Sequence, residues 1–87
     1  MSLLPLGSVV VLNNGEKKLM IYGRMQMEVA TQVMYDYSSC LYPEGYINEE
    51  YNYLFNHDDI EEIIFRGYSD ADEEVFLDYL SNFVIEE

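Results

Sequence analysis

The sequence has very few cysteines and very few bases, and both shortages limit what the protein can be. Cys40 is the single cysteine, so no intrachain disulfide can form, and we expect a reducing compartment. Four lysines and arginines stand against 17 aspartates and glutamates, which gives a net charge of −13. Because nucleic acids and anionic membranes are bound by basic patches, this balance argues against both as partners.

Long apolar runs are also absent from the sequence. No stretch approaches the roughly 18 residues that a membrane-spanning helix needs. The first residues lack the basic segment and the apolar stretch of a secretory signal. We therefore expect a cytoplasmic protein, whose 87 residues form a single domain spanning 1–87.

Motifs for cofactors and metals are missing as well. Gly7, Gly15 and Gly23 do not make up the glycine-rich loop that holds a phosphate at the start of a helix. The acids around Asp58 and Asp59 lack the alternating spacing and the central glycine of a calcium-binding loop. The sequence therefore predicts no cofactor and no metal.

The charge is divided unevenly along the chain. Residues 1–42 carry three acids and three bases, whereas residues 43–87 carry fourteen acids and one base, Arg66. The acidic half is also rich in tyrosine and phenylalanine. Since disordered acidic tails are poor in aromatic residues, we expect this half to fold.

Four segments are predicted to form strands. Residues 9–12 and 18–22 flank Asn13-Asn14-Gly15 and predict a β-hairpin. Residues 32–42 suit a third strand and residues 63–65 a further one. The segment Met25–Thr31 fits a continued strand, a bulge or a loop, and as an exposed edge it would accept an extended peptide or a second copy of the chain.

The C-terminal segment gives the clearest helical pattern. Asp70 and Glu73 have the spacing of a capping box, and a shorter helical turn is predicted after Asn56 or Asp58. An apolar stripe at helical spacing is expected to lie on the sheet: Ala71, Val75, Phe76, Tyr79, Leu80, Phe83 and Val84. The predicted fold is α+β, a small antiparallel sheet covered by this amphipathic helix, with an SH3-like, partly rolled sheet as the alternative arrangement.

The acidic half supplies the candidate binding residues. Carboxylates there would attract a basic protein partner, and exposed tyrosines would anchor it. The candidates are Glu49, Glu50, Tyr51, Tyr53, Asp58, Asp59, Glu61 and Glu62. The competing interpretation is that the charge serves solubility alone.

His57 is the only histidine, and it precedes Asp58 and Asp59. A histidine and an acid can act as an acid–base pair, which leaves a small ligand-binding or hydrolase domain as an alternative. That alternative needs a nucleophile, for which Cys40, Ser38 and Ser39 are the candidates by type. The more common role of such residues is to cap a short helix, and we expect no enzyme.

Six ordered segments carry a resemblance to a known family. They are Leu4–Val10, Lys18–Arg24, Tyr35–Tyr37, Leu41–Gly45, Phe55–Ile60 and Phe65–Tyr68. Together they resemble a Gram-positive bacterial family catalogued as domain of unknown function 4176, over nearly the whole chain. The resemblance implies a small cytoplasmic protein without an established enzymatic activity. Members are often encoded near type VII secretion loci and LXG-type toxins, which implies an adaptor, chaperone or immunity role.

Overall fold

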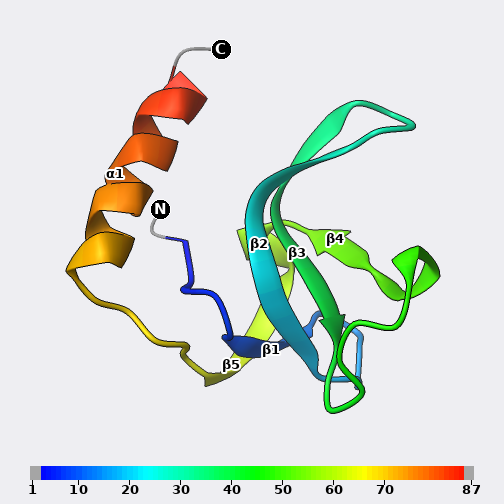
Figure 1. Cartoon of the computed structure of the whole chain (residues 1–87). Helices are drawn as coiled ribbons and strands as arrows, with labels where there is room; N and C mark the ends of the chain where they lie inside the picture. Colours follow the sequence, from blue (N-terminus) through cyan, green and yellow to red (C-terminus); the bar gives the residue numbers. More distant parts are fainter. Residues whose placement is uncertain (1–2, 86–87) are drawn as a thin grey trace.

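The computed structural model describes residues 3–85, and within them the chain forms a five-stranded antiparallel sheet and one α-helix (Figure 1). The strands are β1 (Val9–Leu12), β2 (Leu19–Glu28), β3 (Val33–Leu41), β4 (Tyr53–Phe55) and β5 (Ile60–Phe65). Two 3-10 turns, η1 (Glu49–Tyr51) and η2 (His57–Asp59), flank β4, and the helix α1 spans Ala71–Ile85. The predicted α+β class is confirmed.

The strand order is β4-β3-β2-β1-β5, so the first strand lies in the sheet beside the last. In Figure 1 β1 lies across the lower end of the long, curved β2. The sheet is therefore partly rolled, but β4 and β5 remain its two edges and leave it open.

The predicted hairpin is confirmed. Val9 pairs with Met20 and Val10 with Leu19, while Asn14 takes the positive φ of the connection, at 64°. The ambiguous segment Met25–Thr31 divides between two structures. Its first four residues extend β2, where Gln26, Met27 and Glu28 pair with β3, and the remainder belongs to the turn. The segment is thus one arm of a β2–β3 ribbon that projects beyond the rest of the sheet (Figure 1).

Gly67 lies where the chain leaves β5 and passes the N-terminal segment. A Cβ atom there would lie 2.0 Å from the carbonyl oxygen of Leu6. The backbone of Gly67 also donates a hydrogen bond to the Ser8 hydroxyl, at 3.0 Å. The close approach of these two segments therefore requires glycine.

The core is formed by the N-terminal segment, the sheet and one side of the helix. Its buried members are Leu3, Leu4, Val10, Leu19, Ile21, Tyr37, Phe55 and Leu80. Tyr37, at the centre of β3, has no exposed surface and packs against Phe55 with ring centroids 5.3 Å apart.

Asp70 caps the helix as predicted, but the Glu73 side chain binds Arg24 and does not complete the capping box, and the helix is rotated differently from the prediction. The Glu73 backbone N–H donates to the Asp70 side chain at 3.1 Å, as the capping spacing indicates. The side that faces inward carries Glu73, Leu77 and Leu80, and α1 stands beside the N-terminal segment rather than across the sheet (Figure 1).

The predicted inward stripe is therefore wrong for most of its members. Val75, Phe76 and Tyr79 are exposed by 72%, 44% and 60%, Ala71 is also exposed, and only Leu80 is buried as expected. The side chains of Phe83 and Val84 lie outside the described residues. The physical reason is the carboxylate of Glu73, which is bound by the buried side chain of Arg24 and fixes the rotation of the helix.

Candidate functional site

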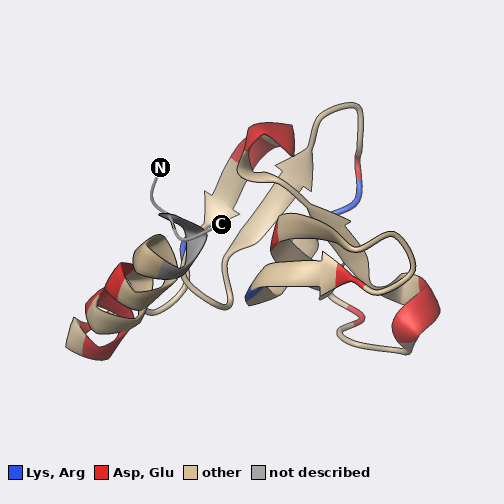
Figure 2. Ribbon diagram, turned by 90° about the horizontal axis from the view of Figure 1, so that it is seen from above, with Lys and Arg blue, Asp and Glu red and all other residues tan. Residues whose placement is uncertain are grey.

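The eight residues predicted to bind a partner form two groups, one at each end of β4. The first comprises Glu49, Glu50 and Tyr51 in η1 with Tyr53 in β4, and the second comprises Asp58 and Asp59 in η2 with Glu61 and Glu62 in β5. Figure 2 shows the two acidic turns as separate red segments. The structure thus brings the members of each group together, but it does not merge the groups.

The first group is held against the sheet by polar and aromatic contacts. The Glu50 backbone N–H donates to the side chain of Asn48 at 2.8 Å, which caps η1. The Tyr22 hydroxyl of β2 donates to the Asn52 side chain, and the rings of Tyr22 and Tyr46 meet edge to face at 6.1 Å. Burial raises the pKa of Tyr22, so this hydroxyl remains a donor at neutral pH.

A hollow of about 500 Å³ separates this group from the projecting β2–β3 ribbon. Its lining comes from both halves of the sequence: Gln26, Met27, Glu28, Val29, Tyr35, Glu49, Asn52, Tyr53 and Leu54. Two carboxylates and two tyrosines stand beside apolar side chains, and the lining contains no base. This chemistry suits a lysine or arginine side chain, which combines an apolar stem with a cationic head.

Several residues of this hollow were not predicted. Glu28 belongs to the neutral half of the sequence, and Tyr35 was predicted only as part of a strand. They join Glu49 and Tyr53 because the ribbon and the segment after η1 lie on the two sides of one hollow. The sequence feature that could have indicated this wall of the hollow is the ambiguous segment Met25–Thr31, which contains both Met27 and Glu28.

Part of the second group has a structural role, and the rest is exposed. One oxygen of Asp59 accepts the Asn56 backbone N–H at 2.9 Å, and Asn56 in turn accepts the Asp36 backbone N–H at 3.1 Å. These contacts fix the start of η2, where a cap was predicted. Asp58, Glu61 and Glu62 are exposed, which leaves their carboxylates available to solvent or to a partner.

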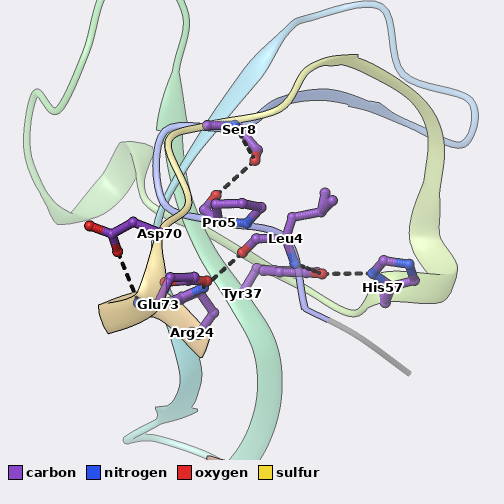
Figure 3. A network of polar contacts seen from close by, with 9 residues as sticks. Leu4, Pro5, Ser8, Arg24, Tyr37, His57, Asp70 and Glu73 are labelled. Carbon is purple, nitrogen blue, oxygen red and sulfur yellow. Dashed lines mark hydrogen bonds and ion pairs between the residues drawn. The ribbon is translucent and has the colours of Figure 1, made fainter. Parts of the chain in front are cut away.

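His57 takes part in a buried polar network (Figure 3). The Leu4 backbone N–H donates to the Tyr37 hydroxyl at 2.9 Å, and this hydroxyl lies 2.6 Å from Nδ1 of His57. The Tyr37 hydroxyl thus joins the Leu4 backbone to the His57 ring through two hydrogen bonds, which hold the ring against the core.

The residues proposed as nucleophiles are placed differently. Cys40 is 1% exposed, and burial raises the pKa of its thiol. The Ser39 hydroxyl donates to the carbonyl oxygen of Tyr53 at 2.9 Å. The side chain at hydrogen-bonding distance from the His57 ring is that of Tyr37, and His57 does not line the hollow beside η1.

The same network continues to the helix (Figure 3). Arg24 donates to the Leu4 carbonyl oxygen at 3.0 Å and binds both carboxylate oxygens of Glu73, at 2.5 and 2.9 Å. The Arg24 and Glu73 side chains are 3% and 11% exposed. No sequence pattern predicted this pair, since its members lie in different elements.

The few bases leave most acids unpaired. Within residues 3–85 the ion pairs are Arg24–Glu73 and Lys17–Glu44, and the hydrogen bond from Lys17 lowers the pKa of Glu44. Lys18 lies over the ring of Tyr42, 5.5 Å from its centroid. The carboxylates of the first group therefore face solvent with no base against them in the described chain.

Two further findings concern the described part of the chain. Among its residues, no three histidine, cysteine, aspartate or glutamate side chains come together in a way that could hold a metal ion. None of its helices has the length and apolar character needed to cross a membrane.

A comparison with models of protein families shows which family the chain belongs to. The model of the family described as domain of unknown function (DUF4176) matches residues 3–76. The chain belongs to the DUF4176 family. The match covers all five strands of this DUF4176 protein and the first turns of α1, while comparisons with curated proteins and with solved structures give no match.

Proposed function

We propose that this DUF4176 protein is a non-enzymatic accessory protein that binds a basic protein partner. The observation that carries the proposal is the hollow between the β2–β3 ribbon and η1, where Glu28 and Glu49 stand beside Tyr35 and Tyr53 with no base among the lining residues. A basic side chain of the partner enters this hollow, its stem against the apolar walls and its cation between the carboxylates.

The overall charge supports this choice of partner. A net charge of −13 accelerates the approach of a basic surface and disfavours a second acidic chain. The tyrosines supply contact area that the charges alone do not, since binding energy concentrates in buried aromatic anchors. The second acidic group, at η2 and β5, contributes to attraction from outside the hollow.

The genomic setting that the family resemblance implies narrows the range of possible partners further. We place the protein in the cytoplasm of a Gram-positive bacterium, where it holds a type VII secretion effector or toxin inactive or ready for export. An adaptor, a chaperone and an immunity protein all share this binding step.

The test is capture of a partner from the host at low ionic strength, followed by a series of salt washes. We expect a basic protein that elutes progressively as salt rises, because exposed charges are screened. Capture that is unaffected by salt would contradict the proposal.

Self-association through the ribbon is the second candidate. Met27 and Val29, at its tip, are exposed by 54% and 89%. This candidate predicts an oligomer in light scattering of the pure protein, whereas partner binding through the acidic hollow predicts a monomer.

A further inference from the structure

The outer face of α1 carries exposed apolar side chains beside exposed acids. Tyr79 follows Val75 by four residues and Phe76 by three, so both side chains neighbour Tyr79 on the helix surface and the three form one stripe. Each is exposed by more than 40%, and the rings of Phe76 and Tyr79 stack at 6.0 Å. Contiguous exposed apolar surface of this kind marks an interaction site.

The position of this stripe is fixed by the polar side of the helix. Glu73 is held by Arg24, and Leu80 lies in the core, so α1 cannot rotate its stripe inward without breaking a buried ion pair. Arg24 also lies 5.5 Å from the ring centroid of Phe76. The ion pair therefore keeps the stripe turned toward solvent.

A hollow of about 360 Å³ lies at the N-terminal end of the stripe. Its lining combines apolar and acidic side chains with one arginine: Leu6, Arg24, Tyr68, Asp70, Asp72, Glu73 and Phe76. Since Arg24 is neutralised by Glu73, the carboxylates of Asp70 and Asp72 remain to attract a cation. Tyr68, which is 80% exposed, and Phe76 offer a surface for the stem of a lysine or arginine.

The negative charge of α1 favours a basic helix over a second copy of α1 as the binding partner. The described residues of α1 include Asp72, Glu73, Glu74 and Asp78 and no base. A second copy of α1 would bring like charges together, whereas a basic helix would bring opposite ones. Two helices that bury apolar stripes against each other also match in shape.

We infer that the exposed stripe of α1 and the hollow at its end form a docking surface for a basic amphipathic helix of the partner. The inference rests on the proposed function, because it names the element of the partner that α1 receives. The apolar side of that helix covers Val75 and Tyr79, and one of its lysines or arginines enters the hollow beside Asp72.

The test uses a synthetic helix with leucines along one side and lysines along the other, titrated into the isotope-labelled full chain. NMR shifts locate the contact, and anisotropy gives the affinity. The variant Val75→Ser/Tyr79→Ser removes two of the three apolar side chains of the stripe without changing the charge. The matched control Glu74→Gln/Asp78→Asn changes the charge on exposed positions of α1 outside the stripe. Circular dichroism confirms that both variants fold.

We expect the largest shifts between Asp72 and Tyr79. The stripe variant should lose affinity by about tenfold or more, and the control by less than about fivefold. Shifts centred on the hollow beside η1, with the stripe variant unaffected, would overturn the inference and leave the proposed function standing. Equal losses in both variants would overturn it as non-specific attraction. Self-association of the pure protein that the stripe variant abolishes would overturn it in favour of a second copy.

The failure of the proposed function gives a different result. In that case the captured partner would bind equally well when Glu28 and Glu49 are reversed in charge, whatever the α1 variants do. The two proposals can therefore fail separately.

Discussion

Arg24 of β2 and Glu73 of α1 form a bidentate ion pair, although they lie 49 residues apart in the sequence. Both side chains are almost fully shielded from solvent. This pair ties the helix to the sheet and also sets which side of the helix faces outward. Removing one partner leaves the other charge buried without compensation, which is far more costly than losing an exposed pair.

We predict that Glu73→Ala lowers the free energy of unfolding by about 3–5 kcal/mol. Arg24 would keep its contact with the Leu4 carbonyl oxygen but lose its counter-charge. Urea denaturation measures the change. The control is Glu74→Ala on the exposed side of the same helix, which should cost less than about 0.5 kcal/mol. Equal effects of the two variants would show that the ion pair does not hold the helix.

The second prediction concerns the buried hydroxyl of Tyr37. Tyr37→Phe keeps the ring in the core but leaves the Leu4 N–H and Nδ1 of His57 without their partner. We expect a loss of about 1–3 kcal/mol in the free energy of unfolding. Tyr51→Phe, at an exposed position, is the control and should be near neutral; a neutral Tyr37→Phe would contradict the network.

The third prediction is a pH dependence from the same residue. Burial raises the pKa of Tyr37 above its ordinary value of 10.0, so the folded protein holds this proton more tightly than the unfolded chain. The resulting stability is complete below pH 10.0 and is lost as pH rises through the folded pKa. Above pH 10.0 the free energy of unfolding should fall more steeply with pH for the natural chain than for Tyr37→Phe. Parallel curves would show that Tyr37 does not contribute.

The fourth prediction concerns the crossing of two backbone segments. Gly67→Ala would place a methyl group against the Leu6 carbonyl oxygen, and we expect a loss of about 1–3 kcal/mol from the forced shift. The control is Gly15→Ala, where the new atom would lie 3.3 Å from the Leu12 carbonyl oxygen. Thermal unfolding compares the two, and a Gly67→Ala variant as stable as the control would contradict the close approach.

Four of the five strands, both caps and the helix could be predicted because their signals are local, whereas β4 (Tyr53–Phe55) was not predicted. Asn14 stands in a hairpin connection, Asn56 begins a short turn, and Asp70 begins the helix. The orientation of α1 could not be predicted in this way. Apolar periodicity pointed to Val75 and Tyr79 as the inner face, but a single buried pair overrides periodicity when it fixes the rotation of the helix.

The candidate site could likewise be predicted only in part. Acidic and aromatic composition led to Glu49 and Tyr53, which do line the hollow beside η1. Glu28 and Tyr35 complete that hollow from the opposite side, and only the curvature of the ribbon brings them there. Composition thus indicated one wall of the hollow and not the other.

The most direct test of the proposed function is the affinity of the purified partner for two variants with the same change of charge. Glu28→Lys/Glu49→Lys reverses the carboxylates inside the hollow, and Glu61→Lys/Glu62→Lys reverses two exposed acids of β5. Titration calorimetry at low salt should show that the first variant binds at least about tenfold more weakly than the second, because only the first removes contacts made in the complex. Equal weakening of the two variants would show that the hollow is not the binding site.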